Sequence, residues 1–461
     1  MGVPAACSPS LAAKVAARDR PLSLARRAVM LLPAAALGGC SLFDDWFGTS
    51  KTPLPGKRVD VMQVSNGLLV DDGARGKVTL PEPVSNADWP QPGGGPAHQM
   101  GRLACGDGLT RAWSSAIGEG GGYRRKITAQ PVVAGGRIFT MDSDAVVTAF
   151  DAAGGGRAWR TDTQGEDDRS TNVGGGIAAD GDTLYASTGR GELLALDAAS
   201  GNIRWRVKLP DVARSAPTIA DKRVFVGILS DQLVACSTVD GKKLWAQQAV
   251  HSENRMLGLP APAVADGLVV AGFGSGDLLA MRDTSGTIAW SDSLASARGR
   301  TSLVDLSSVR GMPAIKDGRV YAIGLGALML GLDLRSGRRL WERDVASSES
   351  PWLAGEWLFV VSQDAQVAAL RREDGAVAWA TQLDPYENME KKKDLIRWIG
   401  PVLAGNRLVV VGTNSKMVTL NPVTGEVVDT RDLDDRASVS PVVAGGTLYV
   451  VTDNATLTAY R

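Results

Sequence analysis

Apolar and polar positions alternate along most of this chain in short runs, which Gly, Asp and Asn residues separate. The clearest case is residues 313–341, PAIKDGRVYAIGLGALMLGLDLRSGRRLW. Two apolar runs flank Asp317-Gly318, a dipeptide typical of a tight hairpin turn. A third run ends before Ser336-Gly337, and charged residues then alternate with Leu340 and Trp341, as in a strand with one solvated face. The pattern predicts four antiparallel strands, which make one blade of a β-propeller.

This spacing recurs along the chain, and each complete copy has a Trp 28 positions after its first residue. The distance between successive Trp residues nevertheless varies from 38 to 51. A unit of fixed length joined by connections of variable length is typical of a repeat protein. The complete copies span residues 131–159, 177–205, 217–245, 262–290, 313–341 and 351–379.

Two further copies are incomplete and show how the ring closes. The seventh begins at Pro401 and has Asp429 in the Trp position, and the eighth begins at Pro441 and is one strand short at Arg461. Residues 110–117, TRAWSSAI, predict the missing strand. We therefore expect an all-β, eight-bladed propeller of four-stranded antiparallel blades in residues 110–461. An N-terminal strand pairs with the C-terminal blade and closes the ring, which leaves no open sheet edge between blades.

The repeated Trp residues are expected to fasten neighbouring blades, because a buried Trp covers roughly 150 to 250 Å² of surface. None of them indicates catalysis. They are Trp113, Trp159, Trp205, Trp245, Trp290, Trp341 and Trp379.

Composition argues against several classes of function. Lys plus Arg and Asp plus Glu number 50 each, and the sequence pI is about 6.8, so no global field attracts nucleic acid. Only His98 and His251 supply imidazole, and no Cys-x-x-Cys or His-rich spacing appears. We predict no catalytic residue, no metal and no cofactor. His98 ends the segment WPQPGGGPAH, whose Pro and Gly content predicts a loop, and we expect its side chain to be solvated.

The N-terminus reads as an export signal. Arg26 and Arg27 precede an apolar run at residues 28–39, too short to span a bilayer, and Cys40 follows it. This arrangement resembles the lipobox of bacterial lipoproteins, which implies a signal peptide at residues 1–39 and a lipid on Cys40. By the same resemblance, Ser41 implies sorting to the outer membrane.

Residues 40–109 are expected to form a lipidated tether and loop before the propeller, with a possible short strand at residues 67–70. Cys105 and Cys236 follow the lipidated Cys40, and the sequence leaves two alternatives for them. They form a disulfide in an oxidising compartment, or they are separate thiols, with Cys236 in the core of a third strand.

The repeated Ala-x-Asp, Gly and Trp positions resemble the eight-bladed propellers of pyrroloquinoline-quinone (PQQ) dehydrogenases. Together with the lipobox and the chain length, they resemble the BamB family of the outer-membrane β-barrel assembly machinery. The resemblance covers residues 110–461. It implies a non-enzymatic scaffold at the periplasmic face of the outer membrane. The scaffold would bind the POTRA domains of the barrel-inserting subunit and help deliver unfolded outer-membrane proteins.

Two loops between blades carry the contact residues of that family. They align here with Leu209, Asp211 and Val212 in the first loop and with Ser308 and Arg310 in the second. The charges of the two loops are exchanged relative to the family pattern.

Two other functions stay open at this stage. One is a PQQ-dependent quinoprotein dehydrogenase, although the adjacent cysteines usual in that family are absent from this chain. The other is a periplasmic propeller that binds a different protein complex or peptidoglycan.

Overall fold

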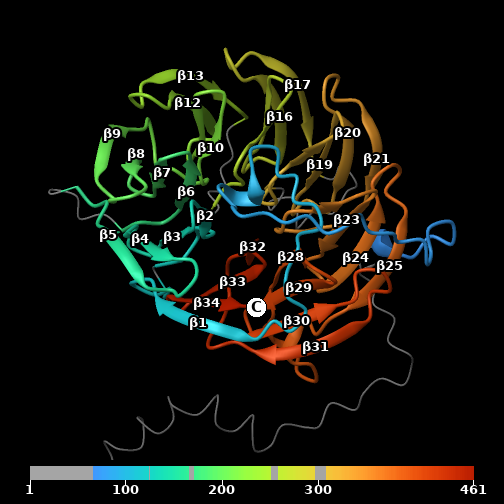
Figure 1. Ribbon diagram of the computed structural model, residues 1–461. Helices are drawn as coiled ribbons and strands as arrows, with labels where there is room; N and C mark the ends of the chain where they lie inside the picture. The colour runs from blue at the N-terminus through green and yellow to red at the C-terminus, as the bar shows by residue number, and fades with distance from the viewer. Residues whose placement is uncertain (1–65, 124, 166–170, 251–257, 296–307) are drawn as a thin grey trace, which may run out of the picture. The chain divides into compact units, whose positions relative to one another are not determined.

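The computed structural model describes residues 66–461 except residue 124 and residues 166–170, 251–257 and 296–307. The described residues form eight four-stranded sheets and one two-stranded sheet, and the eight are arranged around a central axis (Figure 1). The predicted eight-bladed propeller is confirmed. In the described part, helix is limited to two 3₁₀ turns, η1 (Asn66–Leu68) and η2 (Pro92–Gly94).

Each blade runs from an inner strand at the axis to an outer strand at the rim. Blade 1 contains β2 (Val132–Ala134), β3 (Arg137–Met141), β4 (Val147–Asp151) and β5 (Arg157–Thr161). Blade 2 contains β6 (Gly175–Asp180), β7 (Thr183–Thr188), β8 (Glu192–Asp197) and β9 (Ile203–Lys208). Blade 3 contains β10 (Thr218–Ala220), β11 (Arg223–Ile228), β12 (Gln232–Ser237) and β13 (Lys243–Gln248). Blade 4 contains β14 (Ala263–Ala265), β15 (Leu268–Gly272), β16 (Asp277–Arg282) and β17 (Ile288–Ser293).

The second half of the ring repeats this order. Blade 5 contains β18 (Ala314–Lys316), β19 (Arg319–Ile323), β20 (Met329–Asp333) and β21 (Arg339–Arg343). Blade 6 contains β22 (Trp352–Ala354), β23 (Trp357–Val361), β24 (Gln366–Arg371) and β25 (Val377–Gln382), and the hairpin β26 (Tyr386–Asn388) and β27 (Lys393–Leu395) follows it. Blade 7 contains β28 (Trp398–Ala404), β29 (Arg407–Gly412), β30 (Lys416–Leu420) and β31 (Val427–Asp432). Blade 8 contains β32 (Val442–Ala444), β33 (Thr447–Thr452), β34 (Thr456–Tyr460) and β1 (Arg111–Ala116).

The ring closes as the sequence predicts. Strand β1 is antiparallel to β34, with Trp113 opposite Ala459 and Ala116 opposite Thr456. Thr110 and Arg461 exchange two backbone hydrogen bonds of 2.7 and 2.9 Å beside this ladder. The first and last strands of the propeller thus complete one sheet.

The hairpin at Asp317-Gly318 shows why the sequence folds this way locally. Lys316 pairs with Arg319, and Asp317 and Gly318 have φ of 51° and 70°. Positive φ at both central residues is the geometry whose twist matches that of the flanking strands, and Asp-Gly adopts it readily.

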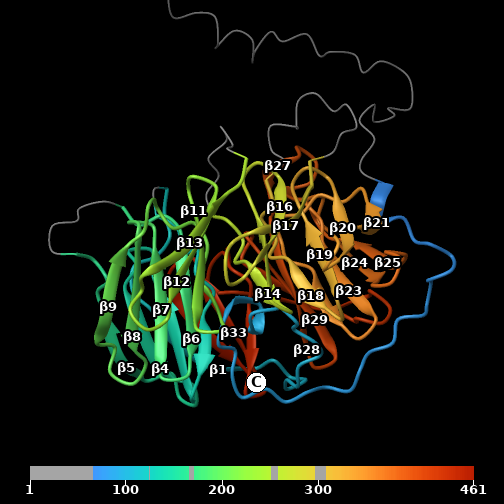
Figure 2. The ribbon, with the colours of Figure 1, turned by 90° about the horizontal axis from the view of Figure 1, so that it is seen from above.

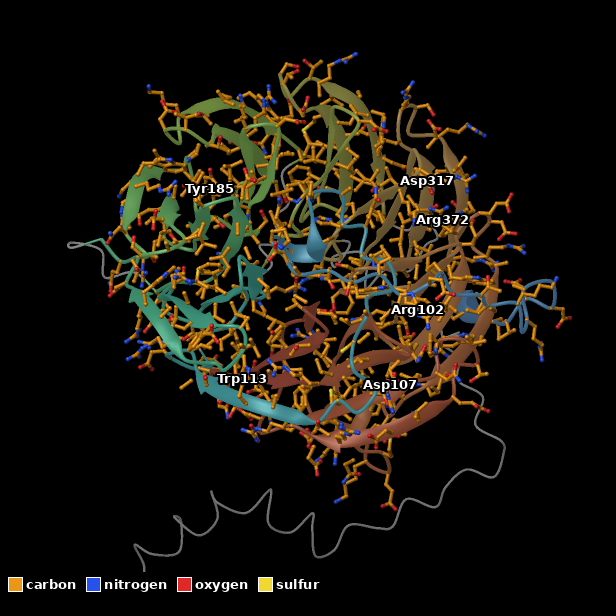
Figure 3. The ribbon with its side chains drawn as sticks, in the orientation of Figure 1. Arg102, Asp107, Trp113, Tyr185, Asp317 and Arg372 are labelled. Atoms are coloured by element: carbon orange, nitrogen blue, oxygen red, sulfur yellow. The ribbon has the colours of Figure 1, made fainter. Side chains whose placement is uncertain are left out.

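The repeated Trp residues lie at the seams between blades. In six of them the indole Nε1 donates to a backbone carbonyl in the third-to-fourth-strand turn of the next blade, at 2.7 to 3.3 Å. Trp113 lies at the seam between blades 8 and 1, where its ring faces Gly155. A charge pair also crosses one seam: Arg372 of blade 6 donates to Asp317 of blade 5 at 2.7 Å (Figure 3).

In four seams the residue two positions after the Trp also binds this turn, and we call this contact the clasp. Hydroxyl groups donate to the carbonyl of the turn glycine at 2.6 to 2.8 Å, and in one seam the Nε of an arginine does so at 2.8 Å. The pairs are Ser115 with Gly155, Thr161 with Gly201, Thr381 with Gly425 and Arg343 with Gly375. In blade 2 the equivalent residue is Val207, which cannot donate.

Replacing Thr381 by valine is expected to lower the free energy of unfolding by about 1 to 2 kcal/mol, because the carbonyl of Gly425 loses its partner. A guanidinium titration measures the change. The matched control is Thr424→Val, since Thr424 is exposed on the same turn and does not cross the seam. Equal stability of the two variants would contradict the role of the clasp.

The segment before the propeller forms an axial strap, residues 86–106, which runs around the central axis of the ring (Figure 1). It hydrogen bonds to the inner strand, or to the turn after it, of every blade in turn, at 2.7 to 3.3 Å. In chain order it reaches blade 8 through Asn86, blade 1 through Trp89, blade 2 through Pro90, blade 3 through Gln91, blade 4 through Pro96, blade 5 through Ala97, blade 6 through Gly101, blade 7 through Leu103 and blade 8 again through Gly106. Val84, two residues before the strap, forms backbone hydrogen bonds with Arg102 and Ala104 near the end of the strap.

The segment before the propeller corrects two sequence predictions. Residues 67–70 form no strand, and the 3₁₀ turn η1 stands at their start. His98 is not solvated: it is 0% exposed, and its Nδ1 lies 2.6 Å from the carbonyl oxygen of Pro313. The loop prediction for residues 89–98 overlooked that a loop can be buried when other strands satisfy its backbone.

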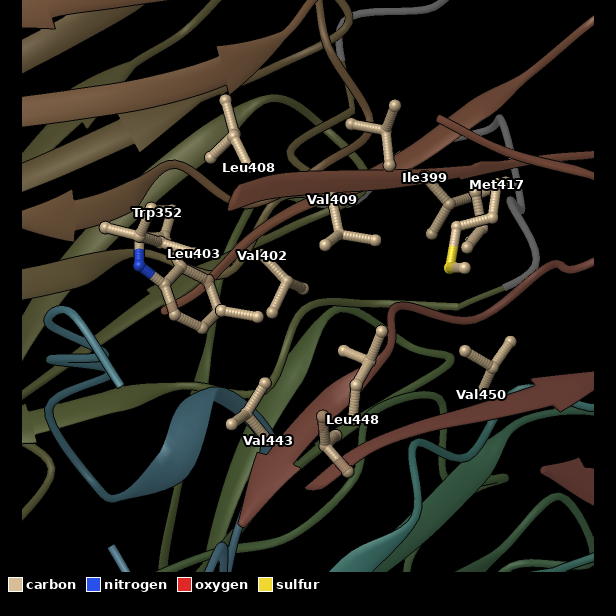
Figure 4. Packing of buried hydrophobic residues seen from close by; sticks show 14 of the residues in the cluster. Trp352, Ile399, Val402, Leu403, Leu408, Val409, Met417, Val443, Leu448 and Val450 are labelled. Atoms are coloured by element: carbon tan, nitrogen blue, oxygen red, sulfur yellow. The ribbon is translucent and has the colours of Figure 1, made fainter. Parts of the chain in front are cut away.

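The largest apolar cluster of the described residues joins the strap to blades 6, 7 and 8. Figure 4 shows part of it, with Val402 and Val409 of blade 7 facing Val443 and Leu448 of blade 8. Trp89 of the strap belongs to the same cluster and stacks on Trp352, with ring centroids 5.9 Å apart. The strap is thus part of the core.

Candidate functional site

The two loops predicted to contact a partner lie on one face of the propeller. Each connects the outer strand of one blade to the inner strand of the next and pairs with that next blade's second-to-third-strand turn. Ala213 bridges Ile228 at blade 3, and Val309 bridges Gly324 at blade 5. We call this side the loop face; Figure 2 shows the propeller edge-on. The strap bonds near the first-to-second-strand turns, at the opposite end of the axis.

The first loop presents only part of its predicted residues. Leu209 is 8% exposed and belongs to a core cluster of blades 2 and 3. Asp211 and Val212 are half-buried, and the Asp211 carboxylate accepts a hydrogen bond from the Val212 amide at 2.7 Å. Asp211 and Val212 therefore offer surface to a partner, whereas Leu209 mainly holds the loop in place.

The second loop behaves in the same way. Ser308 is 1% exposed, and its hydroxyl has no hydrogen-bond partner in the described structure. Arg310 is half-buried, and burial, reinforced by the nearby charge of Arg397, lowers its pKa from the usual arginine value. The structure brings both loops to one face but leaves blade 4 between them.

Arg310 belongs to a charge cluster that the sequence analysis missed. The other members are Glu349 and Arg397, from the connections into blades 6 and 7. Their charges shift the pKa of Arg310, and the charges of the two arginines shift the pKa of Glu349. Glu349 accepts hydrogen bonds from the Gly400 amide at 3.3 Å and from Ser348 Oγ at 2.9 Å. Burial raises the pKa of Glu349, and both arginines oppose that shift.

A repeat signal was available for this cluster. Arg214 and Arg310 stand three positions before the leading prolines Pro217 and Pro313, immediately after the bridging residues Ala213 and Val309. Burial also lowers the pKa of Arg214. Aligning the connections, and not only the strands, would have placed arginines at equivalent points of the loop face.

The remaining candidates for chemistry are residues with metal-binding or nucleophilic side chains. No group of three or more His, Cys, Asp or Glu residues suited to a metal ion occurs among these residues. Cys105 and Cys236 are free thiols, and burial raises the pKa of each to about 11. Of the two alternatives for this pair, separate thiols are correct, and Cys236 lies in β12, the third strand of blade 3.

No helix in the described ranges is both long and apolar enough to span a membrane. Cys40 and the predicted signal peptide at residues 1–39 lie outside the described residues, as does His251.

Comparison with known proteins places these features in a family context. The sequence model of the family described as "Outer membrane protein assembly factor BamB" matches residues 143–381 and 387–461. The chain is also 26% identical over 358 residues to the outer membrane protein assembly factor BamB of Yersinia pestis, which covers 76% of this chain and 88% of that protein.

Solved structures share the architecture. BamB from Moraxella catarrhalis superposes with a TM-score of 0.64 at 20% identity, covering 77% of this chain and 99% of that one. The quinohemoprotein alcohol dehydrogenase ADHIIG from Pseudomonas putida HK5 gives a TM-score of 0.63 at 13% identity, with 83% of each chain covered. At these identities the structural likeness shows the fold alone.

Proposed function

The chain belongs to the family of the outer membrane protein assembly factor BamB, and on that premise we propose that it is a non-enzymatic scaffold of the outer-membrane β-barrel assembly machinery. The match to the family model carries this proposal, because it extends over residues 143–381 and 387–461 and so includes the described parts of both candidate loops. The named relatives are assembly factors, and their role implies a place at the periplasmic side of the outer membrane.

A lipid anchor and a protein contact hold the scaffold in place. Cys40 carries lipid that anchors the chain in the outer membrane, and the loop face binds the POTRA domains of the barrel-inserting subunit. Asp211, Val212 and Arg310 supply the contact, because they are the predicted residues that keep exposed surface. Unfolded outer-membrane proteins are then delivered beside the subunit that inserts them.

Changing Asp211 and Arg310 together to alanine is expected to reduce the recovery of the barrel-inserting subunit when the lipidated chain is purified. Charged groups in an interface steer and orient the partner, so their loss weakens the complex. The matched control is the pair Arg335→Ala and Glu373→Ala, which are exposed in third-to-fourth-strand turns on the opposite side. Undiminished recovery with the first pair would remove these residues from the interface.

The rival function, quinoprotein dehydrogenase, is favoured only by the shared fold. The purified protein, given PQQ, Ca²⁺ and a primary alcohol, is expected to leave an electron-accepting dye oxidised. Alcohol-dependent bleaching of the dye would contradict the scaffold proposal.

A further inference from the structure

A cavity of about 350 Å³ lies at the seam between blades 2 and 3. Its apolar lining comes from both blades: Val207 and Leu209 lie at the end of β9 and just beyond it, and Val234 and Cys236 lie in β12. Cys236 is 2% exposed and Val234 is 0% exposed, so these two belong to the depth of the cavity.

The seam has this apolar lining because a valine occupies the position of the clasp residue. In four other seams a hydroxyl or a guanidinium group binds the turn glycine of the next blade. Here the residue is Val207, and its methyl groups face Gly241 without a hydrogen bond, since valine has no donor. The turn at Gly241 forms another wall of the cavity.

Lysine side chains surround the apolar lining. Lys208, Lys242 and Lys243 line the cavity and are exposed. Lys242 pairs with Asp240 at 2.8 Å, whereas Lys208 and Lys243 enter no ion pair within the described part of the chain. Asp211, the nearest acidic residue along the chain from Lys208, turns its carboxylate to the backbone of its own loop. The rim therefore has cationic groups free to bind an anion.

Exposed apolar residues flank the same walls. Val239 is 79% exposed and Leu244 is 50% exposed, and they lie on either side of the wall residues 241–243. Ile203, 38% exposed, is on β9, the strand that also supplies Val207. Large apolar side chains exposed on the segments that line a cavity indicate a surface that another protein covers.

We propose that this cavity receives an extended segment of a partner protein, in which one large apolar side chain enters between the blades and adjacent acidic side chains pair with Lys208 and Lys243. The apolar depth matches the first group, and the free lysines of the rim match the second. The inference rests on the proposed function, because Leu209 belongs both to this cavity and to the first candidate loop, and it names the kind of segment that the scaffold binds.

The test uses the full-length protein in detergent and a fluorescein-labelled peptide with one phenylalanine followed by two glutamates in a Gly-Ser background. Fluorescence anisotropy is expected to show saturable binding that weakens with added salt. The double variant Lys208→Glu/Lys243→Glu is expected to bind at least about tenfold more weakly, since two attractive contacts become repulsive. Lys391→Glu/Lys393→Glu makes the same change of net charge at exposed residues of the β26–β27 hairpin and is expected to bind like the unchanged protein.

A second readout uses the two thiols of similar pKa. The peptide is expected to slow alkylation of Cys236 and to leave alkylation of Cys105 unchanged, as followed by mass spectrometry of the two tryptic peptides. Cys105 is thus an internal control for global stability.

Three results would overturn the proposal. They are absence of saturable binding, equal binding of a peptide with lysines in place of the glutamates, and unchanged labelling of Cys236 at saturation. Recovery of the barrel-inserting subunit tests the proposed function separately, because this recovery depends on Asp211 and Arg310 and does not require the peptide. If the subunit is still recovered but the peptide does not bind, the proposal for the cavity fails and the proposed function stands.

Discussion

Trp89→Ala is expected to lower the free energy of unfolding by about 3 to 5 kcal/mol. Trp89 is 3% exposed, and its indole stacks on Trp352 at an interplanar angle of 12°. It also covers Gly94, where an added Cβ would lie 3.0 Å from the ring. Truncation therefore opens a cavity between the strap and blade 6, and the surrounding strands cannot collapse into it.

Guanidinium titration of the lipidated chain measures this loss. Trp89→Phe is the matched variant, because it keeps an aromatic ring for stacking and is expected to recover a large part of the stability. Hydrogen exchange gives a local readout at the Val133 amide, which bonds to the Trp89 carbonyl at 2.8 Å. A loss below about 0.5 kcal/mol, the range of surface substitutions, would show that the strap is not part of the core.

Acidification is expected to destabilise the protein through His98. Burial lowers the pKa of His98 to about 4, and the opposing effect of the Pro313 hydrogen bond is smaller. The unfolded chain, with an ordinary pKa near 6.5, binds more protons between these two values. The stabilising contribution is complete above pH 6.5, falls as the pH falls towards 4, and amounts to about 3 kcal/mol at 1.36 kcal/mol per pKa unit.

The matched variant is His98→Asn, which keeps a donor for the Pro313 carbonyl and has no proton to gain. The unfolding free energy of each protein is measured at pH 7 and at pH 4. Subtracting the change in the variant from the change in the histidine protein removes the contribution of all other titrating groups. The histidine protein is expected to lose about 3 kcal/mol more than the variant. Parallel pH profiles would contradict the buried, neutral state of His98.

The repeat made the blades predictable, because each position of a blade has a fixed physical task. A turn dipeptide such as Asp317-Gly318 and a seam residue such as Trp341 are recognisable from residue type and spacing alone. The closing strand followed from the same logic, since the last copy lacked one strand and residues 110–117 had the pattern of an outer strand.

The strap was not predictable in this way, because its contacts use backbone groups that every residue has. The carbonyl oxygens of Pro90 and Pro96 accept hydrogen bonds from blades 2 and 4, and the residue type does not predict these bonds. Gln91 is an exception, since its side-chain amide takes the place of a backbone amide opposite Ile219, at 2.9 and 3.0 Å. His98 was misjudged for the same reason: its burial depends on the ring of blades around it.

The burial of Leu209 and Ser308 in the candidate loops could not be predicted from the family resemblance, because it depends on how the neighbouring blades pack around each loop. The cavity had a signal in the sequence. Comparing the residue two positions after each Trp gives Thr, Val, Gln, Asp, Arg and Thr for the six complete copies, so the apolar Val207 stands out.

The axial strap has a consequence for how the molecule is made. Residues 86–106 are synthesised before any blade, yet their hydrogen-bond partners extend to Gly446 in the last blade. A chain that ends before blade 8, or that is cleaved within it, lacks the backbone groups of Gly445 and Gly446 that bond to the strap. The strap can therefore complete its backbone hydrogen bonds only after blade 8 has been synthesised.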